Sequence, residues 1–189
     1  MKYFYHGSGQ SGILCLEARS RLHGTEESVV YLTDSLPYAL FYLWDESHVG
    51  FSCKHITAWV KDGVVYYEEQ FPDQLATFYK GAVGYLYRIA MEDGYYPVDG
   101  RETMFYASTK QEIEKVDCIA DVYAEILRQE ALGAIKILRY NEQTEERKAW
   151  LTGMVAEGIR RANYYAEDLL RAEFMKTYFP TAWELAQQK

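Results

Sequence analysis

The hydrophobic pattern of this chain changes near Asp121, and that change constrains the fold more than any other feature of the sequence. Before it, short runs rich in β-branched and aromatic residues are separated by turn-forming pairs such as Asp62-Gly63 and Asp99-Gly100, which is typical of strands and tight turns. The predicted strands cover residues 3–6, 28–33, 55–69, 83–91, 102–107 and 115–120. After Asp121 the apolar residues recur at helical spacing. The sequence therefore predicts an α+β fold.

Helical patterns also occur in short segments of the first part. The predicted helices cover residues 12–22, 35–47, 121–133 and 145–176. Pro37 stands near the start of the second of these, and Gly133 is placed to end the third. Residues 135–140 fit either a last strand or an extended connector, because apolar periodicity does not separate the two in so short a run.

The length of the chain, 189 residues, suits one domain of ordinary size. No stretch rich in proline, glycine and serine divides it. We therefore expect residues 1–189 to form a single domain, in which 1–120 make the core and 121–189 make a helical extension packed on that core.

Composition and charge argue against several classes of function. A formal net charge of -8 disfavours nucleic acid as a partner, because binding phosphates requires clustered lysine and arginine. No apolar run is long enough to cross a membrane and the N-terminus lacks the features of a signal peptide, so we expect a cytoplasmic protein. Cys15, Cys53 and Cys118 have neither the spacing of a metal site nor that of a disulfide framework, and are expected to be buried thiols.

Two segments of the first part carry the functional signal. Residues 3–8 form an aromatic strand that ends in His6 and Gly7, and residues 29–42 run through a strand, a turn and a helix with Tyr31 and Tyr42 at the two ends. Together they resemble the NAD-binding core of the ADP-ribosyltransferases, in the branch that includes diphtheria toxin and the poly(ADP-ribose) polymerases. The resemblance covers roughly the first 120 residues. It implies a split, mainly antiparallel mixed sheet with short helices over the cleft, and NAD as co-substrate.

The resemblance implies a role for each of the four residues. Tyr31 and Tyr42 would hold the planar, electron-poor nicotinamide ring between their aromatic faces. Gly7, which has no Cβ, would let its backbone N–H and C=O approach the carboxamide, and His6 would hydrogen-bond a ribose hydroxyl. Packing in the hydrophobic core is the alternative role for these side chains.

Cleavage of the bond between nicotinamide and ribose also requires a carboxylate, which stabilises the positive charge that develops on the sugar. In the family this carboxylate begins a late strand, and the resemblance therefore points to Glu102, at the start of the run 102–107, as a catalytic residue beside His6. An exposed position in a turn is the alternative for Glu102. Other glutamates also flank predicted strands and remain alternatives for the catalytic role, namely Glu68, Glu69, Glu112 and Glu114.

The expected function is transfer of ADP-ribose from NAD, with release of nicotinamide, to an unidentified protein acceptor or to water. The protein would then be an ADP-ribosyltransferase or an NAD glycohydrolase. The alternative is a catalytically inactive module that binds a ligand or a protein on the same fold. The related RNA 2′-phosphotransferases need arginines and a basic face, which the acidic charge disfavours. The sequence contains no signal that fixes an oligomeric state.

Overall fold

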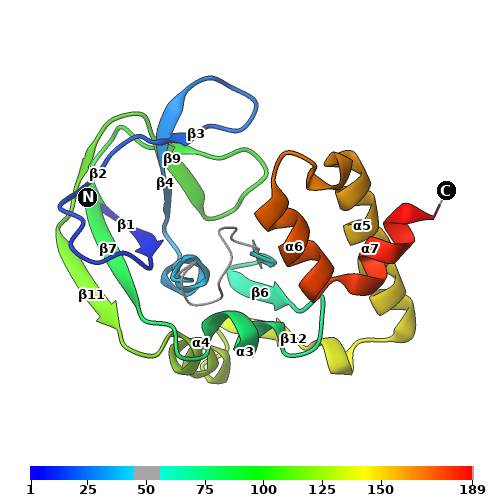
Figure 1. Ribbon diagram of the computed structural model, residues 1–189. Coiled ribbons are helices and arrows are strands. Elements are labelled where there is room, and N and C mark those ends of the chain that lie inside the picture. Colours follow the sequence, from blue (N-terminus) through cyan, green and yellow to red (C-terminus); the bar gives the residue numbers. More distant parts are fainter. Residues whose placement is uncertain (45–55, 189) are drawn as a thin grey trace.

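The computed structural model describes residues 1–44 and 56–188, and its largest sheet contains seven strands. They are β1 (Lys2–Ser8), β3 (Ser20–Arg21), β4 (Ser28–Thr33), β7 (Gly84–Met91), β8 (Tyr96–Pro97), β9 (Met104–Ala107) and β11 (Lys115–Ile119). The strand order is β11-β7-β1-β4-β9-β8, with β3 paired to β4, and every pair is antiparallel. This sheet curves along one side of the molecule in Figure 1.

A second sheet has three strands, β5 (Ala58–Lys61), β6 (Val64–Glu68) and β12 (Ile135–Leu138). The predicted turn between β5 and β6 is confirmed, since Asp62 and Gly63 both have the positive φ, 52° and 76°, that a two-residue hairpin turn requires. β12 runs parallel to β6, and therefore the segment that fitted either a strand or a connector is a strand. The structure thus confirms an α+β fold, in which the large sheet is antiparallel and the three-stranded sheet is mixed.

Three helices of the first two thirds of the chain are short. They are α1 (Leu36–Ala39), which continues into the 3-10 turn η1 (Leu40–Tyr42), α3 (Gln74–Tyr79) and α4 (Val122–Ala131). The hydroxyl of Ser35 caps α1, and Asp121 caps α4, which ends at Gly133 in the left-handed conformation as predicted. Helix α3 was not predicted. Residues 45–47 of the predicted second helix lie outside the described residues.

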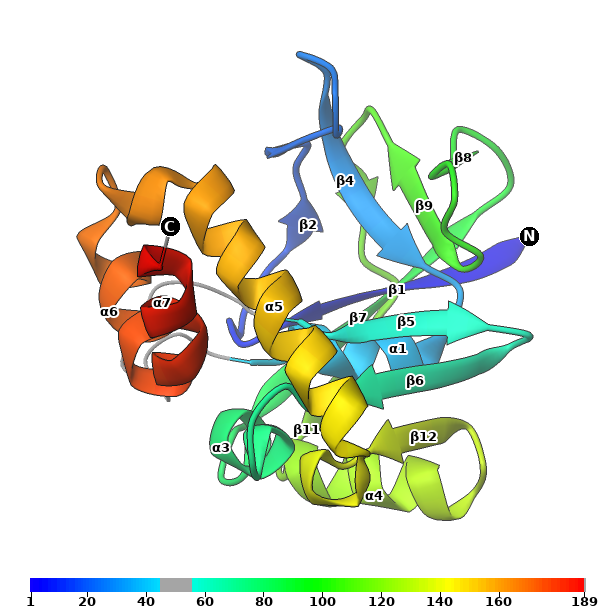
Figure 2. The ribbon, with the colours of Figure 1, turned by 90° about the vertical axis from the view of Figure 1, so that its right-hand side faces the viewer.

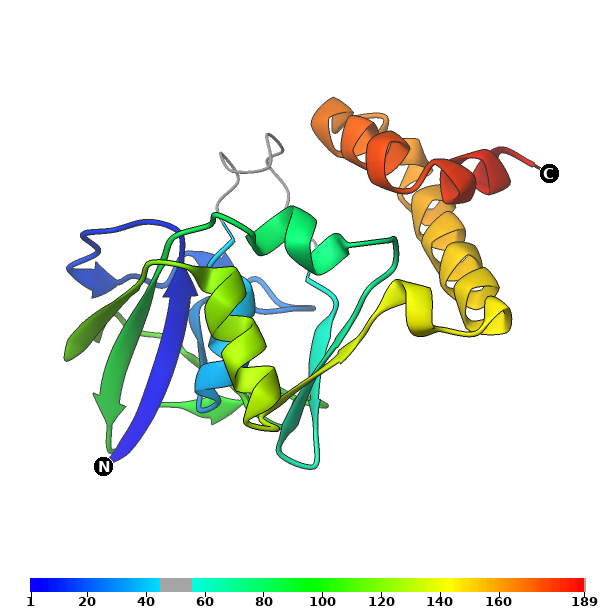
Figure 3. The ribbon, with the colours of Figure 1, turned by 90° about the horizontal axis from the view of Figure 1, so that it is seen from below.

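The C-terminal part is helical, as expected, but it is not one continuous helix. It consists of η2 (Tyr140–Glu142), α5 (Glu145–Arg161), η3 (Asn163–Tyr165), α6 (Leu169–Tyr178) and α7 (Pro180–Gln187). The backbone has positive φ at all three residues of η3, and Asp168 then caps α6. The predicted stretch 145–176 is therefore broken in two. Figure 3 shows α5, α6 and α7 together on one side of the molecule.

The predicted helix over 12–22 is wrong. Within it lies β2 (Cys15–Leu16), which pairs with β10 (Gln111–Glu112), and the segment ends with β3. The apolar residues of this segment pack against strands and not along one face of a helix. Pairing with residues distant in the sequence overrides a weak local helical pattern.

The expectation of buried thiols is also corrected. Cys118 is exposed, because β11 is an edge strand, and Cys15 is partly buried. Cys53 lies outside the described residues.

The hydrophobic core lies between the two sheets, around α1 and η1. Phe41 stacks on Tyr67 of β6, with ring centroids 5.0 Å apart, and Trp44 stacks on Phe78 of α3 at 4.5 Å. Phe78 in turn packs against Phe174 of α6, at 6.0 Å, so that the C-terminal helices join the same hydrophobic cluster. Figure 2 shows α5 running obliquely past β5 and β6.

Glu69, which follows β6, is the buried carboxylate that joins this core to the helical part. It is only 6% exposed, and its two oxygens accept hydrogen bonds from the backbone N–H groups of Leu75 and Tyr140, each at 3.0 Å. We expect Glu69→Gln to lower the free energy of unfolding by about 2 kcal/mol, because the amide nitrogen would face an N–H donor. Urea unfolding measures this loss. The control Glu112→Gln, at an exposed position, should change the free energy of unfolding by less than about 0.5 kcal/mol. An equally small effect of Glu69→Gln would contradict the stabilising role of the two hydrogen bonds that Glu69 accepts.

Candidate functional site

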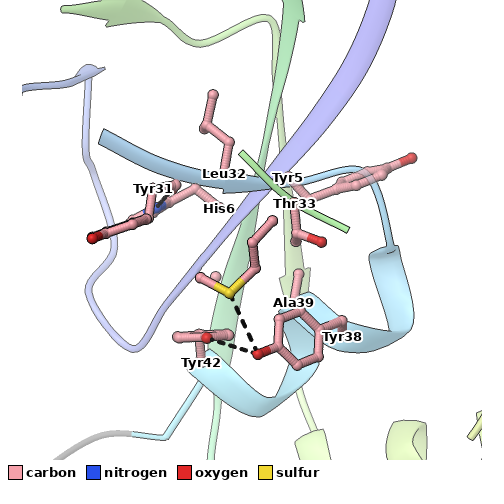
Figure 4. A pocket seen from close by; sticks show the side chains of 10 residues that line it. Tyr5, His6, Tyr31, Leu32, Thr33, Tyr38, Ala39 and Tyr42 are labelled. Atoms are coloured by element: carbon pink, nitrogen blue, oxygen red, sulfur yellow. Dashed lines mark hydrogen bonds between the residues drawn. The ribbon is translucent and has the colours of Figure 1, made fainter. Parts of the chain in front are cut away.

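A pocket opens where β1, β4, α1 and η1 meet, and most of the predicted site residues line it. We call it the tyrosine pocket. Its lining comprises Tyr5, His6, Gly7, Tyr31, Leu32, Thr33, Tyr38, Ala39, Tyr42 and Met104. The pocket has a volume of about 50 Å³, and among the described residues no lysine, arginine, aspartate or glutamate lines it. Figure 4 shows Tyr31 and Tyr42 one above the other, with Tyr38 beside them. Four of the five predicted residues, from two separate segments, therefore lie together.

The pocket exists because β1 and β4 diverge. β1 pairs with β7 along its whole length, but it faces β4 only through Tyr5 and Thr33. Just beyond that pair, Nδ1 of His6 lies 3.1 Å from the carbonyl oxygen of Tyr31. Because a carbonyl only accepts, Nδ1 carries the proton in this contact. The His6 side chain thus bridges the two strands at the point where their backbone pairing ends.

Gly7 lies directly against α1. A Cβ at this position would be 2.3 Å from the carbonyl oxygen of Ala39 and 3.0 Å from Cβ of Tyr42. Any other residue would collide with the helix backbone. The structure therefore gives a reason for glycine that does not depend on a ligand: the strand and the helix that form the pocket pack together without intervening side-chain atoms.

The hydroxyl groups of the tyrosines are held by neighbours. The Tyr42 hydroxyl donates to the Tyr38 hydroxyl at 3.2 Å, and the Tyr38 hydroxyl contacts the sulfur of Met104 at 3.7 Å. Burial, and then the neighbouring Tyr38, raise the pKa of Tyr42 far above its ordinary value, so that this hydroxyl stays neutral. The Tyr31 hydroxyl donates to the carbonyl oxygen of Arg21 at 3.2 Å, which fixes the ring of Tyr31.

Glu102 is the predicted site residue that does not line the tyrosine pocket. β9 begins at Met104, so Glu102 lies in the turn before the strand and not on the strand. It lines a neighbouring hollow of about 140 Å³ together with Trp59, and Tyr38 and Met104 line both spaces. One of its carboxylate oxygens is 3.4 Å from the backbone N–H of Asp62. Glu102 is thus next to the pocket, separated from it by the Tyr38 and Met104 side chains.

The four alternative glutamates are engaged elsewhere. Glu68 forms a paired hydrogen bond with Arg147 of α5, at 2.7 and 2.8 Å, and Glu69 accepts the two backbone hydrogen bonds described above. Glu112 pairs with Lys110, and Glu114 pairs with Arg88 on the large sheet. Glu102 therefore remains the glutamate of these five that lies beside the tyrosine pocket.

A larger hollow adjoins the tyrosine pocket on the side of His6 and Tyr31. Those two residues line both spaces, and the larger one measures about 380 Å³. Its other walls come from the segment around β2 and from β4, and it contains the exposed ion pair of Glu17 and Arg19. This hollow was not predicted from the sequence, because the helical pattern of residues 12–22 does not indicate the strands that form its wall.

Tyr38 and Met104 also line the tyrosine pocket and were not predicted from the sequence. Tyr38 precedes Tyr42 by one helical turn, a spacing that places both side chains on one face and could have identified Tyr38. Met104 has no such signal, because it comes from a distant strand.

Comparison with protein-family models, with curated proteins and with solved structures finds no match to this chain. Within residues 1–44 and 56–188, no group of three or more histidine, cysteine, aspartate or glutamate side chains could hold a metal ion. The helices formed by these residues are too short or too polar to cross a bilayer.

Proposed function

We propose that this protein binds NAD with the nicotinamide ring in the tyrosine pocket, and that it transfers ADP-ribose to a protein acceptor or to water with release of nicotinamide. One observation carries the proposal. His6, Gly7, Tyr31 and Tyr42, which the resemblance to ADP-ribosyltransferases selects from the sequence, line one pocket.

The lining of the pocket supports an aromatic ring as its occupant. The cavity itself holds only about 50 Å³, well below the roughly 300–1,000 Å³ typical of ligand sites, so at most part of a ligand, and not a whole dinucleotide, fits inside it. The tyrosine faces attract a cationic ring. The adjoining hollow, reached past His6 and Tyr31, offers space for the rest of NAD.

The large sheet supports the same proposal. Its strands β1 and β4 are joined by one facing pair and otherwise diverge, which is what the split sheet of the ADP-ribosyltransferases requires. A short helix, α1, lies against the resulting opening through its contact with Gly7.

Glu102 is the carboxylate that we assign to the chemical step. In this reaction the bond between nicotinamide and C1′ of the ribose breaks, its electron pair leaves with nicotinamide, and the sugar develops an oxocarbenium-like charge. A carboxylate beside the ribose stabilises this charge, and the acceptor oxygen or water then attacks C1′. His6 would hold a ribose hydroxyl.

A second candidate function is binding of NAD, or of a ligand with a similar ring, without cleavage. The position of Glu102 favours it, because this glutamate lies in the neighbouring hollow and not in the tyrosine pocket. The two functions share one binding site and differ only in whether nicotinamide is released.

Calorimetric titration with NAD and a nicotinamide-release assay test both functions. We expect Tyr42→Ala to weaken NAD binding about 10- to 100-fold, because one face of the ring loses its stacking partner. Tyr96→Ala, on the exposed strand β8, is the matched control and should bind NAD like the wild type. If the wild-type protein binds no NAD, both functions are wrong; if it binds NAD without releasing nicotinamide, the second one stands.

A further inference from the structure

Tyr38, Tyr42 and Met104 form a chain of polar contacts along one wall of the tyrosine pocket. The Tyr42 and Tyr38 hydroxyls are 3.2 Å apart, and the Tyr38 hydroxyl is 3.7 Å from the Met104 sulfur. Figure 4 shows the Tyr38 hydroxyl directed toward Tyr42 and toward this sulfur. All three residues line the pocket.

The chemistry of the three side chains fixes which group donates in each of these contacts. A thioether has no hydrogen to donate, so the Tyr38 hydroxyl is the donor in its contact with Met104. The Tyr38 oxygen then accepts a hydrogen bond from the Tyr42 hydroxyl. Both O–H bonds therefore point along the wall toward the sulfur, so neither proton is directed into the pocket and the negative ends of the two hydroxyl dipoles lie at its wall.

The row of contacts formed by Tyr38, Tyr42 and Met104 is held rigidly. Tyr38 is only 4% exposed, and its backbone N–H donates to the Ser35 hydroxyl that caps α1. The rings of Tyr38 and Tyr42 meet edge to face, with centroids 5.6 Å apart and an interplanar angle of 77°. Dipoles that are buried and fixed act more strongly on a charge than solvated ones do.

We propose that Tyr38 sets the charge preference of the tyrosine pocket, so that the pocket binds a cationic, N-substituted pyridinium ring in preference to the neutral ring. This inference rests on the proposed function for its natural ligand, which is oxidised NAD. It has two consequences for that function: the uncharged dihydro ring of reduced NAD is disfavoured, and nicotinamide, which becomes neutral when it leaves, binds weakly as a product.

The test compares two small probes that differ in charge, nicotinamide and the N-methylnicotinamide cation, titrated into the full chain and followed by NMR. Wild-type protein is expected to bind the cation more tightly. Tyr38→Phe keeps the ring and its packing but removes the hydroxyl, and should reduce the ratio of the two affinities about 3- to 30-fold. Met104→Leu removes the sulfur that accepts the Tyr38 hydroxyl, so that the O–H bond can turn in other directions. This variant should reduce the ratio of the two affinities by a smaller factor.

Tyr66→Phe is the control, because Tyr66 stacks on Trp59 outside the tyrosine pocket. It should leave the ratio unchanged. If Tyr38→Phe lowers both affinities equally, or neither, Tyr38 only supports Tyr42 by packing and the inference is wrong. If NAD binds but the wild type does not distinguish the probes, the charge preference fails while the proposed function stands. If neither probe nor NAD binds, both fail together.

Discussion

Replacement of Glu102 by glutamine is expected to slow nicotinamide release about 100- to 1,000-fold, while NAD affinity stays within about 3-fold of the wild type. The amide has the shape of the carboxylate and can still accept the hydrogen bond from the Asp62 N–H. It cannot supply the negative charge that the oxocarbenium-like state needs. A single-turnover assay with saturating NAD measures the chemical step separately from binding.

The position of Glu102 makes this variant informative. The residue is exposed and lies in a turn, so the substitution should leave the fold intact. Glu92→Gln, at another exposed position next to a turn, is the matched control and should not change the rate. A rate that is equally unchanged in Glu102→Gln would remove Glu102 from the mechanism and leave the catalytic carboxylate to be found elsewhere on the chain.

Local sequence patterns predicted the elements whose structure is decided locally. Asp62-Gly63 forms the expected hairpin turn, because the pair accepts positive φ, and Gly133 ends α4 for the same reason. The spacing of Tyr31 and Tyr42 placed both on the walls of one pocket, because a strand, a turn and a short helix follow one another with no long loop between them.

Elements that depend on distant partners were predicted less well. Residues 15–16 and 20–21 form strands because Gln111–Glu112 and Ser28–Thr33 lie beside them, and no local pattern reveals such partners. The break after α5 has only Asn163 as a local marker, because Tyr164 and Tyr165 also adopt positive φ, which their bulky side chains do not favour.

The residues of the candidate site also fall into two groups, those with a local sequence signal and those placed by tertiary packing. His6, Gly7, Tyr31 and Tyr42 come from two segments with distinct motifs, and the structure brings them together. Tyr38 and Met104 contribute to the wall through tertiary packing, and Glu102 was assigned to a strand that begins only at Met104. Four residues that line the tyrosine pocket were therefore predictable from the sequence, whereas the position of Glu102 outside that pocket was not.

The largest effect on stability is expected from Gly7→Ala. The new methyl group would stand 2.3 Å from the carbonyl oxygen of Ala39, which is backbone and cannot move aside as a side chain does. We expect the free energy of unfolding to fall by about 3 kcal/mol and NAD affinity to fall at least about 10-fold, because β1 and α1 must separate and the pocket between them changes shape. Urea unfolding and calorimetry measure the two effects.

Gly153→Ala is the matched control, because no described atom beyond the adjacent helix backbone lies within 4 Å of the position that its Cβ would occupy on α5. Alanine there should stabilise the protein by about 0.5–1 kcal/mol through its higher helix propensity. The pair of measurements separates two reasons for glycine at position 7. A stable Gly7→Ala protein that no longer binds NAD would mean that the glycine serves only the approach of the ligand, whereas loss of stability together with affinity, as the contact with Ala39 predicts, would mean that the close packing of strand and helix creates the pocket.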